Sequence, residues 1–172
     1  MKPVIFLRIA SVLTFIHAAL HTIGGVFGSA DPGVQQATVA TMKANEFVVM
    51  GVTRSYWNFY RGMGLAVSVF LAMEAVVFWQ LGSLAKMDGS RLRPVLAAFS
   101  VGYLGFAAVS YRYFFAAPVI TEILIALCLG LAIAFAKQAA REIGLDNCPE
   151  LGGRSLVKAK TTTKALTQRS RS

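Results

Sequence analysis

The stretch F-I-H-A-A-L-H-T-I-G-G-V-F-G, residues 15–28, decides the fold predicted for this chain. It belongs to a long apolar run that begins near Pro3. If this run is a helix, steps of four and three residues follow one face that carries only small or polar residues: Ala10, Thr14, His17, His21, Gly24 and Gly28. In a bilayer the lipid is already apolar, so small and polar residues mark the face that contacts other helices. The pattern therefore predicts a membrane-spanning helix whose two histidines point into a helical bundle.

The composition extends this prediction to most of the chain. Of 172 residues, 56% are hydrophobic and 15% are charged, whereas soluble domains carry about 25% charged residues. Apolar runs long enough to cross a ~30 Å hydrocarbon core recur. We expect an all-α, four-helix transmembrane bundle within residues 1–139, followed by a basic and largely disordered tail, residues 140–172. The four helices are predicted at residues 4–27, 56–84, 94–115 and 118–139. In the third helix, Ala98, Gly102, Gly105 and Arg112 share one face, where the glycines would allow another helix to approach closely. Tyr103 is expected only to supply a polar tip on this helix.

The positive charge indicates how the bundle is oriented. The chain has 17 Lys and Arg residues and a net charge of +9. Most of these residues lie before the first predicted helix, between the second and third, or after the fourth. Because Lys and Arg are retained on the cytoplasmic side, both termini are predicted to be cytoplasmic. The tail is expected to bind anionic lipid headgroups; nucleic-acid binding is not expected, because no binding motif accompanies the charge.

The connection between the first two helices, residues 29–55, is predicted to lie outside. Asp31-Pro32 is a typical helix start, and residues 34–50 are expected to form a short amphipathic helix. This helix would lie over the outer mouth of the bundle or in the membrane interface. An ordinary helical loop explains the same pattern equally well.

Each of the four helices contributes a polar residue to the outer half of the bundle. These residues are His17, His21, Arg61, Arg112 and Glu122. Several ionisable groups at one depth suggest a shared polar cavity, so one interpretation is a pocket that opens outward. The other is a buried network that fixes how the helices pack. No metal site is predicted, because only one carboxylate lies near the two histidines.

Glu74 is a separate intramembrane candidate in the cytoplasmic half. We expect its partner to be a Tyr, Ser or Arg of that half. A role in proton transfer would require a second titrating group, which the sequence does not identify. Cys128 and Cys148 form no disulfide framework, and neither a phosphate-binding loop nor a haem-attachment motif is present, so whether the protein has a cofactor stays unknown.

Two segments resemble a known family. H-A-A-L-H-T-I-G-G and R-S-Y-W-N-F-Y-R-G-M-G are similar to motifs of an uncharacterised family of small bacterial four-helix integral membrane proteins. The first helix also distantly resembles the opening of DoxX-like proteins. The resemblance implies a multi-pass protein of the bacterial plasma (inner) membrane, but it supplies no catalytic residue and no substrate.

These observations leave three functional hypotheses. The first is a non-enzymatic protein that binds a small or lipid-like ligand in the outer-half pocket or supports a membrane complex. The second is a membrane-embedded enzyme that uses His17, His21 and Glu122 for acid–base or redox chemistry. The third is a transporter subunit, for which four helices would need to form a homo-oligomer. The sequence does not decide whether the protein is an enzyme.

Overall fold

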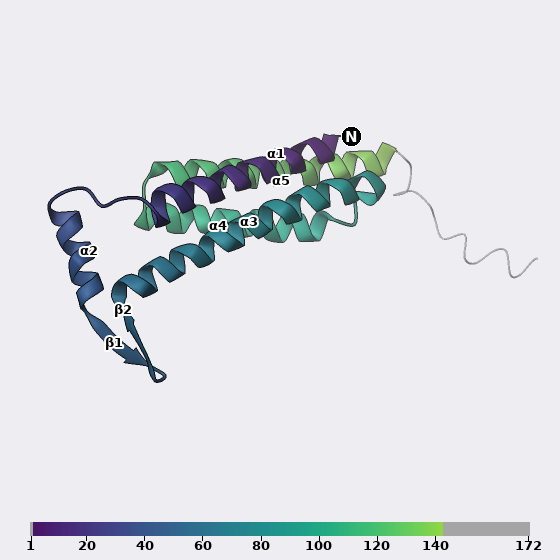
Figure 1. Ribbon diagram of the computed structural model, residues 1–172. Helices are drawn as coiled ribbons and strands as arrows, with labels where there is room; N and C mark the ends of the chain where they lie inside the picture. Colours follow the sequence, from purple (N-terminus) through teal and green to yellow (C-terminus); the bar gives the residue numbers. More distant parts are fainter. Residues whose placement is uncertain (1, 143–172) are drawn as a thin grey trace, which may run out of the picture. The chain divides into compact units, whose positions relative to one another are not determined.

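Four long helices dominate the computed structural model, which describes residues 2–142 and gives side-chain environments for residues 2–136. They are α1 (Lys2–Leu20), α3 (Tyr56–Asp88), α4 (Arg93–Tyr113) and α5 (Ala116–Glu142) (Figure 1). With the helical extension of α1 to Val26, all four are long and apolar enough to cross a membrane. The prediction of four helices that are long and apolar enough to span a membrane is therefore confirmed. The predicted basic tail lies, from residue 143 onward, outside the described residues.

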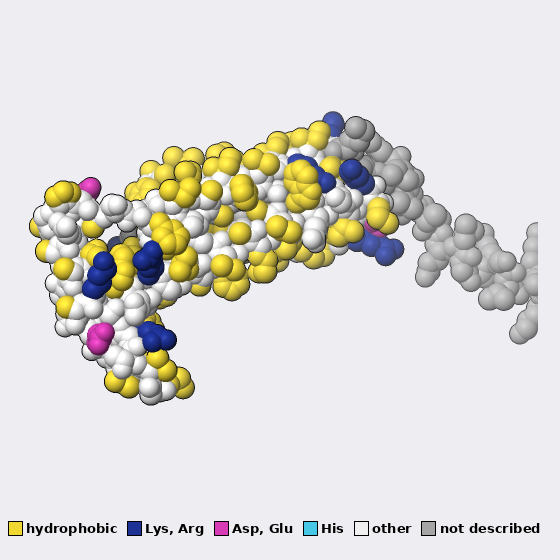
Figure 2. Space-filling view, viewed as in Figure 1, with side chains coloured by type: hydrophobic (Ala, Val, Ile, Leu, Met, Phe, Trp, Pro, Cys, Tyr) yellow, Lys and Arg dark blue, Asp and Glu magenta, His cyan; other side chains and the backbone are white. Residues whose placement is uncertain are grey.

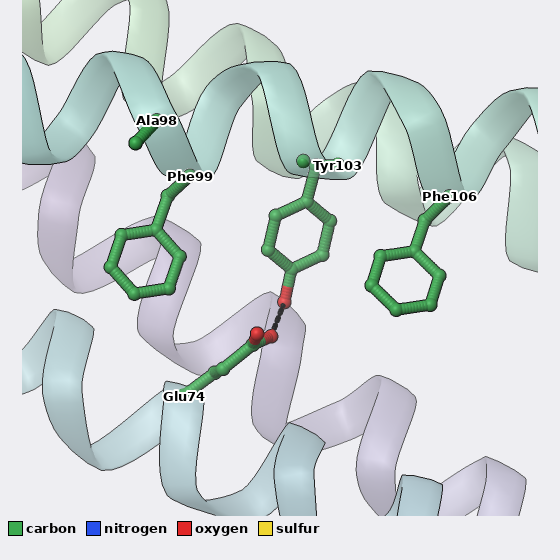
Figure 3. Close-up of a pocket in the computed structure, with 6 residues that line it drawn as sticks. Glu74, Ala98, Phe99, Tyr103 and Phe106 are labelled. Carbon is green, nitrogen blue, oxygen red and sulfur yellow. Dashed lines mark hydrogen bonds between the residues drawn. The ribbon is translucent and has the colours of Figure 1, made fainter.

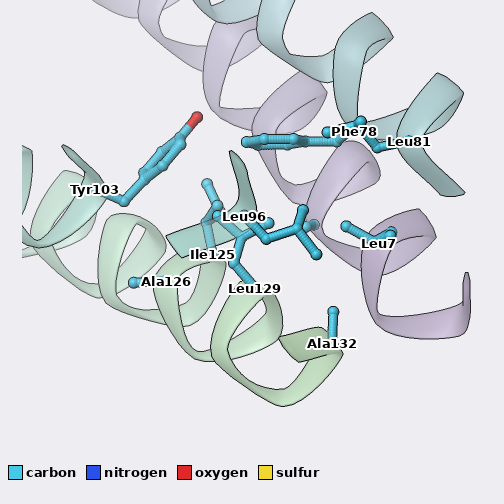
Figure 4. Packing of buried hydrophobic residues seen from close by; sticks show 10 residues of the cluster. Leu7, Phe78, Leu81, Leu96, Tyr103, Ile125, Ala126, Leu129 and Ala132 are labelled. Atoms are coloured by element: carbon cyan, nitrogen blue, oxygen red, sulfur yellow. The ribbon is translucent and has the colours of Figure 1, made fainter. Parts of the chain in front are cut away.

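The core of the bundle is formed by large apolar side chains from all four helices (Figure 4). Leu7 of α1, Phe78 of α3, Leu96 of α4 and Leu129 of α5 are each at most 1% exposed. Phe78 also meets Phe99 edge to face, with ring centroids 5.1 Å apart. Helix association within a bilayer depends on van der Waals packing, which these side chains supply.

The outside of the bundle is apolar as well. Figure 2 shows hydrophobic side chains over the flank of the helices, while Lys and Arg side chains gather toward the two ends. Large residues such as Leu20, Val69 and Leu127 are more than half exposed. A soluble bundle would place polar residues there, so this surface fits contact with lipid.

The predicted polar face of the first helix is only partly correct. Ala10 and Thr14 are fully buried, but Gly24 and Gly28 are exposed. The helix changes at its end into a π-helical segment, η1 (His21–Val26). The wider turn accommodates an extra residue, which rotates the following side chains and buries Val26 in place of the glycines.

The connection from η1 to α3 contains strands as well as a helix. The helix α2 (Val34–Ala44) is followed by strands β1 (Glu46–Val49) and β2 (Val52–Ser55), which pair in antiparallel fashion. The expectation of helix up to Met50 is therefore wrong for residues 45–50. Met50 and Gly51 both have positive φ, 51° and 80°, as a tight two-residue hairpin turn requires. Phe47, Val48 and Val49 also favour strands.

Helix α4 presents a different face to the bundle from the predicted one. The expected face carried Ala98, Gly102, Gly105 and Arg112, all of which are exposed. The buried residues of α4 are Leu96, Tyr103, Ala107 and Ser110. This rotation lets the tyrosine and serine hydroxyls reach partners on other helices, which matters because unpaired polar groups are costly in hydrocarbon.

Candidate functional site

A hydrogen bond between Tyr103 of α4 and Glu74 of α3 lies at the centre of the candidate site (Figure 3). The Tyr103 hydroxyl donates to Glu74 Oε2 at 2.7 Å. The same hydroxyl lies 3.4 Å from Thr14 Oγ1 of α1. Three helices therefore meet at one polar cluster, and the prediction that Glu74 has a Tyr, Ser or Arg partner matches this geometry.

Packing fixes the position of Tyr103. Its side chain is 2% exposed, and its ring lies 6.0 Å from Phe78 and 6.3 Å from Phe106, measured between ring centroids. Thr14, fully buried, donates its own hydroxyl to Ala10 O at 2.9 Å. The carboxylate of Glu74 is thus held by a tyrosine that has little freedom to move.

Glu74 also lines a groove on the surface of the bundle. The groove has a volume of about 220 Å³ and is lined by Glu74, Ala98, Phe99, Gly102, Tyr103 and Phe106. In Figure 3 the rings of Phe99, Tyr103 and Phe106 project from α4 in a row, and the Glu74 carboxylate lies against the Tyr103 hydroxyl. A Cβ atom at Gly102 would meet nothing within 4 Å. The small residues of α4 therefore leave space here, instead of allowing close helix contact.

The depth of this groove follows from the helix geometry. Tyr103 lies midway along α4, so at 1.5 Å per residue it is about 15 Å from either end of the helix. That distance is half of a ~30 Å hydrocarbon core. If α4 crosses the bilayer, Glu74 and Tyr103 lie near the membrane centre, whereas the sequence places Glu74 in the cytoplasmic half.

The predicted outer-half cluster is not joined by direct contacts. Arg61 places its guanidinium over the ring of Phe27, 4.8 Å from the centroid. Arg112 is exposed and lies over the neighbouring Tyr113. Within residues 2–136 neither arginine forms an ion pair with Glu122. The expected charge network is therefore absent among these residues. Both guanidinium groups lie over aromatic rings instead, and Arg112 points away from the bundle.

The remaining outer-half residues have local partners. His21 Nε2 lies 3.2 Å from Gly64 O, an arrangement that the π-helical turn of η1 permits. Glu122 is 4% exposed, and its Oε1 accepts a hydrogen bond from Ser110 Oγ at 2.9 Å. Glu122 Oε2 and His17 Nδ1 are buried without a hydrogen-bond partner among the described residues.

His17 and Glu122 lie at similar depths. The neighbouring helices α1 and α5 are antiparallel, and Phe6 stacks on Phe135 with ring centroids 5.4 Å apart. Counting along each helix from that pair brings His17 and Glu122 to within about one turn, ~5 Å, of the same level. The part of the chain that the structure describes holds no cluster of three His, Cys, Asp or Glu residues suited to a metal ion.

Tyr103 is the residue of the candidate site that the sequence does not single out. The sequence indicates only a polar tip on the third helix. The available signal is that a tyrosine midway along a membrane-spanning helix has no interface to reach, unlike the Trp and Tyr residues near helix ends. Its hydroxyl must therefore find a partner inside the bundle.

Comparison with known proteins identifies no relative of this chain. No protein-family model, curated protein or solved structure matches this chain.

Proposed function

We propose that this multi-pass membrane protein binds a small lipid-like ligand in the groove beside Glu74. The observation that supports this most strongly is the Glu74 carboxylate itself, which lies in an otherwise mainly apolar groove halfway along the helices. Ionisable groups at that depth are costly to maintain and are usually functional. Glu74 is partly exposed in the groove wall, where a ligand can reach it.

The lining suits a ligand that is mostly apolar. Phe99, Phe106 and Ala98 offer an apolar surface, and the carboxylate offers one fixed polar contact. Ligand sites in proteins typically combine many apolar groups with a few well-placed polar ones. This proposal moves the site from the predicted outer-half pocket to the groove between α3 and α4. The contacts of His21 with Gly64 and of Glu122 with Ser110 favour a packing role for the outer-half residues.

The experiment compares two leucine substitutions on the same helix. The protein is extracted into nanodiscs with its native lipids, and the bound molecules are identified by mass spectrometry. Gly102→Leu fills the groove, whereas Gly105→Leu adds the same side chain to α4 away from its lining; a Cβ at either position meets nothing within 4 Å. We expect a molecule that remains bound in the wild type and in Gly105→Leu but is lost in Gly102→Leu. Identical bound molecules in all three proteins would contradict the proposal.

We further propose that the protein resides in a bacterial plasma membrane with both termini in the cytoplasm. The distribution of Lys and Arg supports this orientation, and the resemblance to small bacterial membrane proteins supports the location. In this arrangement α2 and the β1–β2 hairpin lie outside the cell. Glu74 then faces the middle of the bilayer and is reached by ligands dissolved in the membrane.

A further inference from the structure

We infer that the ligand of the groove is a lipophilic amine in its protonated, cationic form, whose N–H group donates to Glu74. This inference rests on the proposed function and adds the chemical class of the ligand. It is carried by three features of the groove: a Glu74 carboxylate that has no cationic partner within residues 2–136, the aromatic row on α4, and the depth of the carboxylate.

The first feature is that no Lys, Arg or His side chain within residues 2–136 pairs with Glu74. Tyr103 donates to Oε2, but no hydrogen bond to Oε1 is formed within residues 2–136, and the one ion pair there joins Arg91 to Asp88. A carboxylate in a low-dielectric setting is strongly stabilised by an opposite charge nearby. A ligand ammonium group would supply that charge and also donate a hydrogen bond, which is the stronger, charge-assisted kind.

The second feature is the row of rings beside the carboxylate. Phe99 and Phe106 flank Tyr103 on α4, and all three line the groove (Figure 3). The faces of aromatic rings attract cations, and more strongly where water is excluded. The same rings offer an apolar surface for the hydrocarbon part of an amine. A carboxylic acid ligand would be repelled by Glu74, and an alcohol would gain the hydrogen bond without the charge.

The third feature excludes the headgroups of ordinary bilayer lipids. Glu74 pairs with Tyr103, which lies about 15 Å from either end of α4, whereas lipid amines remain at the membrane surface. An amine must therefore enter the hydrocarbon region to reach the carboxylate. That requirement selects a small amine attached to an apolar body.

The test uses three probes with the same apolar part and different head groups. They are 4-phenylbutylamine, 4-phenylbutan-1-ol and 4-phenylbutanoate. Each is titrated calorimetrically against the full chain in phosphatidylcholine nanodiscs, with the heat from empty nanodiscs subtracted. We expect the amine to bind at least about 10-fold more tightly than the alcohol, as one strong charge-assisted contact implies, and the acid to show no binding.

Two variants assign the effect to the carboxylate. Glu74→Gln should weaken amine binding by about 10-fold or more while leaving alcohol binding nearly unchanged. Glu46→Gln removes the same charge from an exposed position in β1 and should change neither. If Glu74→Gln does not fold, Phe106→Leu keeps the carboxylate and removes one ring. In that variant the amine should lose more affinity than the alcohol.

The outcomes separate this inference from the proposed function. If the alcohol binds as tightly as the amine and Gly102→Leu abolishes both, the groove binds ligands but the amine inference is wrong. If phosphatidylethanolamine in the nanodiscs displaces the amine, a lipid headgroup is the occupant and the inference is again wrong. If no probe binds and Glu74→Gln instead changes the oligomer mass, a second copy of the chain covers the groove. If no probe binds and Gly102→Leu also leaves the co-purifying molecules unchanged, the proposed function fails too.

Discussion

The bond between Tyr103 and Glu74 gives the first prediction at the scale of single residues. Tyr103→Phe removes the hydroxyl but keeps the ring that packs against Phe78 and Phe106. Hydrogen bonds between membrane helices contribute about 0.6 kcal/mol on average and up to ~1.7 kcal/mol. We expect a loss of this size in the free energy of unfolding, measured by SDS titration in mixed micelles.

The matched control for that prediction is Tyr111→Phe. Tyr111 is 83% exposed and should be replaceable at no measurable cost. Equal losses in both variants would mean that the Tyr103 hydroxyl contributes no specific bond.

The absence of a contact between Arg61 and Glu122 gives the second prediction. Residues without shared partners show additive losses within ~0.5 kcal/mol, whereas contacting pairs couple by ~0.5–3 kcal/mol. The losses in the free energy of unfolding caused by Arg61→Ala and Glu122→Ala should therefore add in the double variant. Glu122→Gln should be tolerated, because the amide oxygen still accepts from Ser110 and a buried charge is removed.

The measurement is the same SDS titration, applied to the two single variants and the double variant. A coupling free energy above ~1 kcal/mol between the two sites would contradict this prediction and support the buried charge network predicted from the sequence.

The sequence predicted individual polar residues better than it predicted their partners. Glu74 was recognisable because a carboxylate in an apolar run is rare. The contacts of Arg61 and Arg112 were not predictable, since a shared depth does not fix how far each helix is rotated. Arg112 lies in the last turn of α4, where its long side chain can leave the bundle.

At the scale of elements, the π-helical segment η1 explains the main error in the first helix. Steps of three and four residues assume an uninterrupted α-helix, and one wider turn shifts every later position. The prediction therefore held for Ala10 and Thr14 and failed for Gly24 and Gly28. The β1–β2 hairpin was not predictable for a similar reason. Asp31-Pro32 indicates a helix start, but no equally clear signal marks the end of the helix at Ala44.

The contact between η1 and α3 gives the third prediction. A Cβ atom at Gly64 would lie 3.0 Å from Val26 Cγ2, which is closer than packed carbon atoms tolerate. Gly64→Ala should lower the melting temperature through overpacking, which typically costs ~1–3 kcal/mol. Val26→Ala in the same chain should recover part of that loss by removing the clashing methyl groups.

Gly62→Ala is the control, measured in the same thermal-unfolding experiment. A Cβ atom at Gly62 meets nothing within 4 Å, and alanine favours the helix over glycine. The melting temperature of this variant should equal that of the wild type or be slightly higher. A larger loss in Gly62→Ala than in Gly64→Ala would show that η1 does not pack here.

At the scale of the whole molecule, the fourth prediction concerns orientation in the membrane. In a chain with Cys128 and Cys148 replaced, single cysteines are introduced as Gln36→Cys and Met87→Cys. Both positions are exposed and lie at opposite ends of the bundle. A membrane-impermeant maleimide should label position 36 in intact cells and position 87 only after permeabilisation.

Labelling of both positions in intact cells would contradict the four-span topology. Labelling of position 87 alone would show that the protein has the opposite orientation in the membrane.

The four spans themselves were predictable, because length and composition alone distinguish them. The groove was not, since it depends on which face of α4 turns inward. Gly102 was expected to bring helices together, but it lies exposed at the groove instead.

The position of the groove in the bilayer is tested most directly by spin labels. A nitroxide attached at Gly102→Cys in a lipid bilayer should collide often with dissolved oxygen and rarely with a water-soluble nickel chelate, as expected near the membrane centre. The same label at Tyr111→Cys, near the end of α4, should report a shallower depth, and at Gln36→Cys it should report water. If the label at position 102 meets the nickel chelate as often as the label at position 36, the groove beside Glu74 does not lie within the membrane.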